Sequence, residues 1–577
     1  MSDQKRIGVY ICHCGGNISD YVDVEGVLRA VQDEPGVVVA KTAMFTCSDA
    51  TQQEMVRDIR EQNLTGLVVA SCSPKLHLFT FREVARRAGL NPYQYTQVNI
   101  REQCSWAHTG DRAGATEKAI RLVRGGIART NFTEPLEPIT IDTVPKVLVV
   151  GAGIAGLRAA TGLADLGLSV LLVEKSASAG GKVAGLGKMY PHEKTGREII
   201  ARLVDEVKRR ENITLFTNAE LVEKSGSIGN FRVKIRLGGK QREEIEENAG
   251  CIIVATGFDT YRPREGEYGY GIDGVLTLAE YKELLDRCGG GLVRNGKPVK
   301  DIVYIYCVGS RQQAGEKPNR YCSRYCCNAA VHASIQSSEA SPGIHQFHLF
   351  RDMRTYGKFE TLYGRARDQG AVFVRYSESE PPAVEKGADG KLKVTVKDLL
   401  TFGEQIEIPA DVVVLVTGMV PARNEALVDV LKLPVGRDGF FNEIHPKLRP
   451  VETVVDGVFI CGACQGPKNS AESVASALAA VTQSASILKK GYVELEPLIA
   501  SVDPGLCELC DVCAGACPYS AIERDHYQGK EVARVNEAVC KGCGGCAPVC
   551  PRNAINLKGY TDAQMESMID AMLKEIG

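Results

Sequence analysis

The stretch KVLVVGAGIAGLRAATGLADLGLSVLLVEK, residues 146–175, decides the fold of this chain. An apolar run at 147–150 leads directly into Gly151, Gly153 and Gly156, and a helical run of small residues separates it from a second apolar run. In such a strand–turn–helix the first glycine permits a tight turn, the second lets the backbone approach a pyrophosphate, and the third lets the helix pack against the strand. The stretch therefore predicts a Rossmann-type domain that binds a dinucleotide at the start of the helix.

Later stretches extend this prediction to a flavin. Glu174 ends the second apolar run, where a carboxylate can accept hydrogen bonds from ribose hydroxyls, and a Gly180-Gly181 pair follows it. Residues 251–259 and 412–421 both end an apolar run in a Thr-Gly turn, and residues 457–481 resemble a closing flavin motif. Together these features resemble flavoproteins with two dinucleotide domains, such as thioredoxin reductase, and imply FAD. The expected cofactor-binding residues are Gly151, Gly153, Ile154, Ala155, Gly156, Glu174, Lys175, Gly181, Lys182, Thr256, Gly257, Gly462 and Ala463.

Composition narrows the class of protein. The chain has 577 residues, enough for several domains, and its formal net charge of −2 gives no indication of nucleic-acid binding. Residues 1–10 lack the apolar core of a signal peptide. Arg158 and Asp165 interrupt the most apolar stretch, around the flavin motif, so we expect no transmembrane span. The 21 cysteines are unusual, and in a large chain without a secretion signal they indicate metal ligation in a reducing cytoplasm.

The first 130 residues predict a small parallel α/β domain, because apolar strands alternate with polar, helical segments. The expected strands are residues 7–11, 37–44, 66–70 and 95–100. Each is followed by cysteine, and the carboxyl ends of parallel strands meet at one ligand-binding edge. The resulting candidates for a [4Fe–4S] cluster are Cys12, Cys14, Cys47, Cys72 and Cys104.

Four thiolates are enough for such a cluster, so one of the five is surplus, and spacing does not say which. The alternative is that all five are buried free cysteines. His13 and His108 are nearby, but we do not expect either to be a ligand. Three prolines in residues 131–145 then predict an extended linker.

The middle of the chain departs from the thioredoxin-reductase pattern. A strand at 301–310 stands where a second phosphate loop should begin, but the glycines are missing. A C-x14-C-x3-CC set replaces them and predicts a [4Fe–4S] cluster where a nicotinamide cofactor would otherwise bind. The alternative is an incidental cysteine-rich loop. The four cysteines are Cys307, Cys322, Cys326 and Cys327.

At this point the chain resembles the family of heterodisulfide reductase A subunits, the HdrA-like iron–sulfur flavoproteins. The resemblance rests on CHCGGN, CSPKLH, NIREQCSW, MRTYGKFE and the C-x14-C-x3-CC set, and it covers most of the chain. It implies a cytoplasmic protein, often a homodimer, that works with B and C subunits and with a hydrogenase, a formate dehydrogenase or ferredoxin. Many members perform flavin-based electron bifurcation, in which one donor sends one electron to ferredoxin and one to a disulfide-type acceptor.

Two features differ from this family pattern. The longest members carry a ferredoxin-like insertion in the flavin domain, whereas residues 220–250 here are short and contain no cysteine. His332 lies five residues after the cysteine pair, where relatives often have lysine close to the flavin. His332 is therefore a possible neighbour of flavin N5, with an ordinary helix-face role as the alternative.

The C-terminal region holds two C-x2-C-x2-C-x3-C-P runs, the pattern of a bacterial two-cluster ferredoxin. Since the fourth cysteine of each run ligates the other cluster, the predicted sets are Cys507, Cys510, Cys513 with Cys550, and Cys540, Cys543, Cys546 with Cys517. The tail predicts a helix with Met565, Met568, Ile569, Met572, Leu573 and Ile576 on one face, either packed on its own domain or free to bind a partner.

Four cysteines remain. Cys461 and Cys464 form a C-x-x-C in the closing flavin motif, where a redox-active dithiol is possible but small residues are needed anyway. Cys251 and Cys288 are expected to be structural.

We therefore expect an α/β multidomain oxidoreductase with one FAD and four [4Fe–4S] clusters. It combines a thioredoxin-reductase-like FAD domain with an N-terminal α/β domain and a C-terminal ferredoxin domain. Alternatives are a non-bifurcating conduit of the quinone-interacting type and, less favoured, an NAD(P)H-dependent flavin reductase. The expected parts are 1–130 (N-terminal), 131–145 (linker), 146–260 and 401–495 (FAD), 261–400 (modified nicotinamide-type) and 496–577 (ferredoxin with terminal helix).

Overall fold

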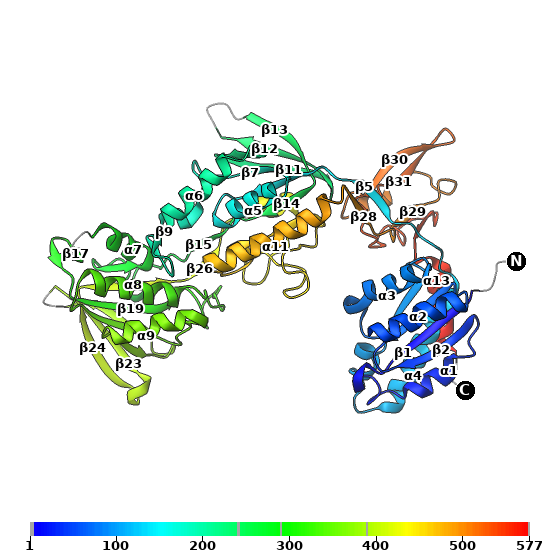
Figure 1. Ribbon diagram of the computed structural model, residues 1–577, viewed down its shortest axis with the longest axis horizontal. Coiled ribbons are helices and arrows are strands. Elements are labelled where there is room, and N and C mark those ends of the chain that lie inside the picture. The colour runs from blue at the N-terminus through cyan, green and yellow to red at the C-terminus, as the bar shows by residue number, and fades with distance from the viewer. Residues whose placement is uncertain (1–4, 239–242, 289–290, 388–389, 575–577) are drawn as a thin grey trace. The chain divides into compact units, whose positions relative to one another are not determined.

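The computed structural model describes residues 5–238, 243–288, 291–387 and 390–574. These residues form two compact units (Figure 1). Unit 1 combines Met1–Thr140 with Glu494–Gly577, and unit 2 is Ile141–Val493. The two ends of the sequence therefore share one unit, and the flavin motif lies in the other.

A four-stranded parallel sheet forms the N-terminal part of unit 1, in the order β2-β1-β3-β4. Its strands are β1 (Ile7–Cys12), β2 (Val37–Ala43), β3 (Gly66–Ser71) and β4 (Tyr95–Asn99). The helices are α1 (Val24–Val31), α2 (Asp49–Glu61), α3 (Pro74–Ala88) and α4 (Arg112–Asn131). All four expected strands are present, and β1 and β3 are buried along their whole length, as expected of central strands in a covered parallel sheet.

The ferredoxin part of unit 1 contains two antiparallel strand pairs, β29 (Ala500–Val502) with β32 (Ile555–Leu557) and β30 (Ile522–Tyr527) with β31 (Lys530–Val535). A short helix, α12 (Val512–Ala516), follows the second cysteine of the first run.

The terminal helix α13 (Asp562–Leu573) packs on α4, so the tail packs within its own unit (Figure 1). Arg121 donates a hydrogen bond to the carbonyl of Met572 (3.1 Å), and the Gln564 amide donates to the carbonyl of Phe132 (3.0 Å). Three apolar side chains of the predicted face are nevertheless exposed, those of Met565, Ile569 and Leu573. Ile576 lies outside the described residues.

A five-stranded parallel sheet forms the flavin half of unit 2, in the order β10-β7-β6-β14-β27. Its strands are β6 (Lys146–Val150), β7 (Ser169–Val173), β10 (Ile213–Phe216), β14 (Cys251–Val254) and β27 (Val458–Ile460). The accompanying helices are α5 (Ile154–Asp165), α6 (Gly196–Lys208) and α11 (Ser470–Leu488). An antiparallel sheet of β11 (Ala219–Ser227), β12 (Asn230–Leu237) and β13 (Glu243–Ala249) fills the short segment where the longest relatives are expected to carry an insertion.

The other half of unit 2 is a second parallel sheet in the order β16-β25-β19-β20-β21. Its strands are β16 (Val275–Thr277), β19 (Asp301–Val308), β20 (His345–Phe350), β21 (Val372–Arg375) and β25 (Val412–Thr417). Its helices are α7 (Leu278–Arg287), α8 (Cys326–Ala340) and α9 (Glu360–Asp368), and an antiparallel sheet of β22 (Ala383–Lys386), β23 (Leu392–Asp398) and β24 (Glu404–Ala410) joins it.

These pairings correct one expectation. The sequence of residues 412–421 predicts a second flavin-type turn, but β25 pairs with β19 and β16 of the second sheet. The boundary expected at residue 401 therefore falls between the paired strands β23 and β24. The apolar runs of β14 and β25 look alike in sequence because both are buried central strands, and only the pairing separates them.

Short elements complete the chain. They are β5 (Ile139–Asp142), β8 (Lys188–Met189), β9 (Lys194–Thr195), β15 (Phe258–Thr260), β17 (Val293–Arg294), β18 (Lys297–Pro298), β26 (Met419–Pro421), α10 (Glu425–Leu431) and β28 (Tyr492–Leu495). Within the ranges that the structure describes, no helix is both long and apolar enough to cross a membrane.

Candidate flavin and iron–sulfur sites

The glycine loop between β6 and α5 has the shape that a dinucleotide requires. Gly151 has φ +104°, and a Cβ on Gly156 would lie only 1.7 Å from the carbonyl oxygen of Gly151, so the helix can approach only without a side chain there. A Cβ on Gly153 would meet nothing within 4 Å. Open space thus lies where the pyrophosphate is expected, and Ile154 and Ala155 begin the helix beside it.

Glu174 is fixed at the same loop. Its buried carboxylate accepts hydrogen bonds from the backbone N–H of Ala152 (2.8 Å) and of Ser176 (2.9 Å). The turn at Gly180 is attached to the glycine loop, because the N–H of Gly180 donates a hydrogen bond to the Ala152 carbonyl (2.7 Å). The carboxylate and both glycine turns are therefore held together.

The remaining predicted flavin residues form the other side of this region. Gly181 lies beside Gly153, and Lys182 pairs with Asp259 at 3.3 Å, whereas Lys175 is exposed. Gly462 starts a short 3-10 turn, η7 (Gly462–Gln465), in which Ala463 is buried. A Cβ on Gly462 would lie 2.8 Å from Ala155, so this turn packs on the start of α5.

The Thr256–Gly257 turn supports the fit of a ligand here. The hydroxyl of Thr256 is buried and has no hydrogen-bond partner among the described residues. Gly257 has φ +74°, and a Cβ there would meet nothing within 4 Å. Since buried polar groups are normally satisfied, the open space and the free hydroxyl fit a polar cofactor such as FAD.

Cys461 and Cys464 do not form an exposed dithiol. Both are buried, and the Cys464 thiol donates to the carbonyl of Cys461 at 3.1 Å. Burial raises the pKa of Cys461 well above its usual range and raises the pKa of Cys464 to about 11. Both are therefore thiols rather than thiolates near neutral pH, which favours a packing role.

Lys468 is a candidate flavin-adjacent residue that sequence reasoning missed. It lies between η7 and α11, and burial lowers its pKa from the usual value, while nearby Cys464 acts in the opposite direction. The Cys464 sulfur in turn lies near the backbone N–H groups of Thr256 and Gly257. A half-buried cation is thus present at the turns that we assign to the flavin.

We expect Lys468→Met to make the flavin harder to reduce, because reduction adds negative charge that a nearby cation stabilises. A tenfold fall in the reduction equilibrium, about 30 mV for two electrons, is the expected size. Equilibrium titration with a redox dye measures it, and Lys468→Arg should retain most of the wild-type potential. Lys317→Met, on an exposed loop, is the control. An unchanged flavin potential in Lys468→Met would remove Lys468 from the site.

The C-x14-C-x3-CC set is assembled around the end of β19 and the start of α8. The thiols of Cys326 and Cys327 are hydrogen-bonded, which raises the pKa of Cys326 and lowers that of Cys327. Cys307 and Cys322 lie close enough to raise the pKa of Cys326 further. The structure thus gathers the four predicted cysteines, with Cys322 the most accessible.

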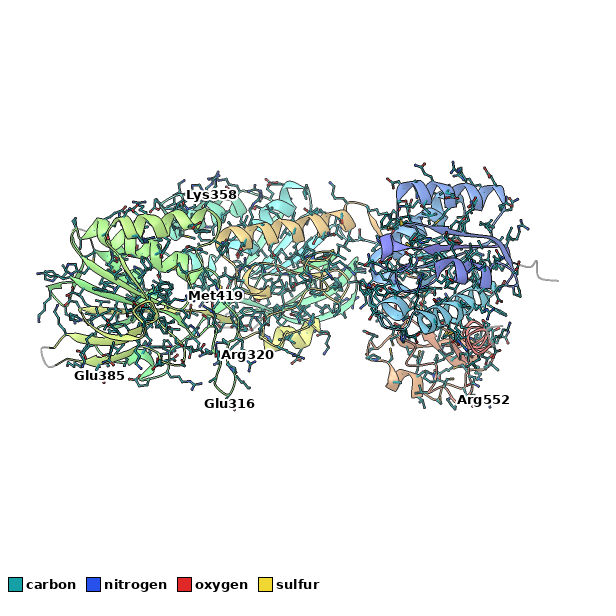
Figure 2. The ribbon with its side chains drawn as sticks, turned by 90° about the horizontal axis from the view of Figure 1, so that it is seen from below. Glu316, Arg320, Lys358, Glu385, Met419 and Arg552 are labelled. Atoms are coloured by element: carbon teal, nitrogen blue, oxygen red, sulfur yellow. The ribbon has the colours of Figure 1, made fainter. Side chains whose placement is uncertain are left out.

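The loop between Cys307 and Cys322 replaces the expected phosphate loop. Its residues Glu316 and Arg320 project outward from unit 2 (Figure 2). Cys307 itself has φ +63°, a left-handed conformation that is uncommon for a residue other than glycine. Such strain concentrates at functional positions, which agrees with a ligand role for Cys307.

His332 lies on α8 and is buried against a turn of the flavin half. Its Nε2 lies 3.0 Å from the carboxylate of Glu193, and its ring meets Tyr190 edge-on. Neither neighbour belongs to the glycine loop, the Thr256–Gly257 turn or η7. Burial lowers the pKa of His332 below its usual 6.5, Lys282 lowers it further, and Glu193 raises it.

Acidification from pH 7 to 5 should therefore cost stability through His332. Because its folded pKa is lowered, the unfolded chain binds the proton more readily, and stability is lost as the pH falls through about 6.5. The loss is at most about 1.4 kcal/mol for each pH unit. Thermal midpoints measured against pH should fall less steeply in His332→Gln. They should fall more steeply in Glu193→Gln, which lacks the stabilising carboxylate. Parallel profiles for wild type and His332→Gln would contradict the assignment.

Four of the five N-terminal cysteines are neighbours. Burial raises the pKa of Cys47, and the nearby Cys12 and Cys14 thiols raise it further. Burial raises the pKa of Cys72 to about 11, Arg101 acts against this, and Cys14 again raises it. Cys12 and Cys14 follow β1, Cys47 follows β2 and Cys72 follows β3, so the expected strand edge brings them together.

Arg101 and Thr46 donate hydrogen bonds to two of these sulfurs. The Arg101 guanidinium donates to Cys14 Sγ at 3.4 Å, and the backbone N–H of Thr46 donates to Cys12 Sγ at 3.4 Å. Donors of this kind stabilise thiolates and cluster sulfurs.

Cys104 differs from the other four. It lies in a π-helical turn at Arg101–Ser105, is fully buried, and has a pKa raised by burial to about 11, with Lys118 acting against this. His13 lies 3.9 Å from Glu25, and His108 lies 3.2 Å from Lys118, so both are occupied by charged neighbours.

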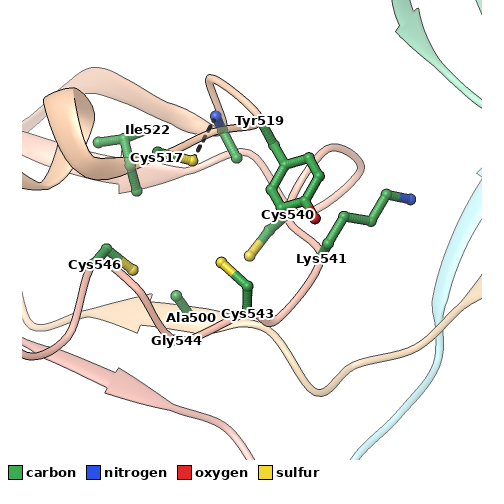
Figure 3. Close-up of a pocket in the computed structure, with 10 residues that line it drawn as sticks. Ala500, Cys517, Tyr519, Ile522, Cys540, Lys541, Cys543, Gly544 and Cys546 are labelled. Carbon is green, nitrogen blue, oxygen red and sulfur yellow. Dashed lines mark hydrogen bonds between the residues drawn. The ribbon is translucent and has the colours of Figure 1, made fainter. Parts of the chain in front are cut away.

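The two ferredoxin sets each line one hollow. Cys517, Cys540, Cys543 and Cys546 line a space of about 320 Å³ that is partly open to solvent (Figure 3). Cys507, Cys510, Cys513 and Cys550 line a second space of about 360 Å³. In each, three cysteines of one run meet the fourth of the other, as the spacing predicts.

Backbone N–H groups also face the sulfurs of these hollows. Ala521 donates to Cys517, Ala533 to Cys507 and Ala554 to Cys550, each at 3.3 Å. Across the described ranges, no three His, Cys, Asp or Glu side chains stand close enough to bind a single metal ion. The four cysteines that line each hollow match the number of thiolates that a [4Fe–4S] cluster takes.

Comparison with known proteins agrees with this geometry. A pyridine nucleotide-disulphide oxidoreductase family model matches residues 145–297, and a 4Fe-4S dicluster domain model matches residues 506–554. The second iron–sulfur A subunit of the CoB–CoM heterodisulfide reductase of Methanopyrus kandleri is 38% identical, over 92% of this chain and 93% of that protein. The chain belongs to the family of heterodisulfide reductase A subunits. It is therefore an oxidoreductase with a Rossmann-type FAD domain and a [4Fe–4S] dicluster domain.

Other members of this family are similar over comparable lengths. The A subunit of the H2:CoB–CoM heterodisulfide, ferredoxin reductase of Methanothermobacter marburgensis is 36% identical over 90% of this chain and 91% of that protein. The A subunit of the H2/formate:CoB–CoM heterodisulfide, ferredoxin reductase of Methanococcus maripaludis is 35% identical over 92% and 93%. Among solved structures, the thioredoxin reductase of T. acidophilum is 18% identical with a TM-score of 0.40, covering 59% of this chain and 99% of that one.

Proposed function

We propose that this chain distributes electrons within a heterodisulfide-reductase-like complex, using one FAD and four [4Fe–4S] clusters. Bound FAD supplies the exchange between electron pairs and single electrons, which iron–sulfur clusters lack. The chain's own residues hold these groups in place and exclude water around them. Electrons enter from a two-electron donor and leave by bifurcation, toward ferredoxin and toward a disulfide-type acceptor.

One observation carries this proposal. The turn after β19, where a nicotinamide-binding flavoprotein would hold the phosphates of its cofactor, instead brings four cysteines together. The flavin cradle thus shares unit 2 with an iron–sulfur ligand set rather than with a second dinucleotide loop. This arrangement supports an electron-transfer role over an NAD(P)H-dependent flavin reductase.

The proposed ligand sets use sixteen of the 21 cysteines. In the N-terminal domain the ligands are Cys12, Cys14, Cys47 and Cys72, because these thiols are neighbours, and Cys104 is a core residue. In unit 2 they are Cys307, Cys322, Cys326 and Cys327. The two ferredoxin sets are those that line the hollows of the C-terminal domain.

The proposed partners follow from the family. Relatives are named for H2, formate and ferredoxin as electron partners and for the CoB–CoM heterodisulfide as acceptor. We infer B and C subunits or equivalents, a hydrogenase, formate dehydrogenase or ferredoxin as electron partner, and a homodimer of this chain within the complex. The abundance of free cysteines suits a reducing compartment, the cytoplasm.

The proposal is tested with the complex purified anaerobically from its source. With H2 or formate as donor, ferredoxin should be reduced only when the heterodisulfide is also present, in equal electron amounts. Ferredoxin reduction without the acceptor, or acceptor reduction that does not require ferredoxin, would contradict bifurcation.

A non-bifurcating conduit is the second candidate, and one observation favours it. Residues 219–249 contribute the strands β11, β12 and β13, so the segment where the longest relatives are expected to carry additional clusters contains no cysteine. In that case the acceptor is reduced at the same rate with and without ferredoxin.

A further inference from the structure

Four residues beside the Cys307 set carry buried polar atoms that have no partner. These atoms are Ser310 Oγ, Arg311 Nη1, Arg351 Nε and both amide atoms of Asn328, as judged among the described residues. Ser310 is 1% exposed and Asn328 6% exposed. Leaving a buried polar atom unpaired is destabilising. The guanidinium and amide nitrogens among them are donors, so their gathering beside the four cysteines indicates a ligand that accepts hydrogen bonds.

Both guanidinium groups are clamped onto the turn that follows Cys307. Arg351, just after β20, donates to the carbonyl oxygens of Ser310 (2.8 Å) and Arg311 (3.0 Å) and pairs with Glu378. Arg311 pairs with Asp352 at 2.5 Å. The two arginines are thus fixed by backbone and carboxylate contacts and cannot swing away without breaking them.

The turn that follows Cys307 has an unusual backbone conformation. Cys307 and Arg311 both have left-handed φ angles, +63° and +56°. A Cβ on Gly309 would lie 2.0 Å from the Tyr261 ring, so position 309 can only be glycine. Left-handed non-glycine residues are unfavourable and persist where surrounding contacts fix them.

We propose that Arg311, Arg351 and Asn328 form a hydrogen-bonding shell that raises the reduction potential of the cluster at Cys307, Cys322, Cys326 and Cys327. This inference rests on the proposed function, since it requires a cluster there. With the cluster bound, the step would be the addition of one electron to its oxidised form, supplied by the electron donor of the proposed function and by dithionite in the titration below. No bond would be made or broken, and the cluster would gain one negative charge. Donors and cations in a buried site stabilise that added charge, so they favour the reduced form.

Both guanidinium groups also lie close to the sulfur of Cys307. The proposed shell therefore faces a ligand of the cluster directly.

An anaerobic, EPR-monitored titration of the full-length holoprotein with dithionite tests the shell. Arg351→Gln and Arg311→Gln should each lower the equilibrium constant for reduction of this cluster at least tenfold, about 59 mV for one electron. Arg351→Lys and Arg311→Lys keep the positive charge but lose the planar guanidinium group with its several N–H donors. The reduction potential should shift less in these variants than in the glutamine variants. Arg375→Gln is the matched control, because Arg375 pairs with the same Asp352 (3.1 Å) from β21. It should leave the potential unchanged.

Iron content separates the possible failures. Cys326→Ser identifies the EPR signal of this cluster in the wild type. If that variant removes neither iron nor signal, the cluster itself is absent and the proposed function fails. If the cluster is present and the arginine variants that retain it titrate at the wild-type potential, the shell alone is overturned. Should the glutamine variants lose the cluster, the lysine variants and Asn328→Leu supply the potentials, and no shift in any of them overturns the inference.

Discussion

Gly153→Val is expected to leave the chain folded and to abolish flavin binding. Gly153 has an extended backbone (φ −74°, ψ −175°) that valine adopts, and a Cβ there meets nothing within 4 Å. The branched side chain would instead fill the space at the start of α5 that we assign to the pyrophosphate. FAD affinity should fall at least a hundredfold, roughly 2.7 kcal/mol.

Flavin absorbance per chain after gel filtration measures the effect, and circular dichroism shows whether the fold persists. Gly364→Ala, in α9 with no atom within 4 Å of the added Cβ, should retain flavin and is the control. Gly156→Val is the opposite case, because its Cβ would lie 1.7 Å from a backbone oxygen and should prevent folding of the flavin half. A folded Gly153→Val protein with full flavin content would place the cofactor elsewhere.

Cys326→Ser is expected to remove one whole cluster, roughly four irons per chain, while flavin remains bound. Cys326 is buried at the start of α8, within reach of the other three thiols of its set. A serine hydroxyl does not supply the thiolate that the cluster requires. We expect loss of electron transfer between the flavin and the acceptor, but not of folding.

Two other cysteines provide matched controls. Cys251 is fully buried in β14, where burial raises its pKa to about 12, and Cys288 follows α7. Neither belongs to a proposed ligand set, so Cys251→Ala and Cys288→Ser should keep all irons. Equal iron in Cys326→Ser and wild type would show that this set holds no cluster.

Much of the site could be predicted because its chemistry is local in sequence. The β6–α5 turn, Glu174 and the two ferredoxin runs each lie within about thirty residues, and spacing alone fixes which atoms can meet. The motif likewise predicts that Cys517 of the first run lines the hollow of the second run, and that Cys550 of the second run lines the hollow of the first.

Other features depend on packing between distant segments. The burial of Cys104 in the π-helical turn after β4 is one such feature, because no spacing rule encodes that turn. The position of β25 depends on strand pairing across more than one hundred residues, as in the match of Ile302 with Val412. Lys468 could not be found from the sequence, because its burial comes from the fold and not from any motif.

His332 illustrates the limit of an argument by position. His332 lies five residues after the cysteine pair and on the same helix as the proposed ligands Cys326 and Cys327. Its side chain nevertheless contacts Glu193 and Tyr190. Its proximity to flavin N5 stays a prediction, and the half-buried Lys468 is the better-supported cation near the flavin turns.

The central claim is that one chain holds an FAD and four clusters, and anaerobic iron and flavin quantitation with an EPR-monitored redox titration tests it most directly. We predict about sixteen irons and one FAD per chain. We also predict four separable cluster signals, and bifurcation predicts a flavin that passes from oxidised to fully reduced without a lasting radical signal. About twelve irons or fewer would contradict the N-terminal or the Cys307 assignment, and a long-lived flavin radical would contradict bifurcation in favour of the conduit.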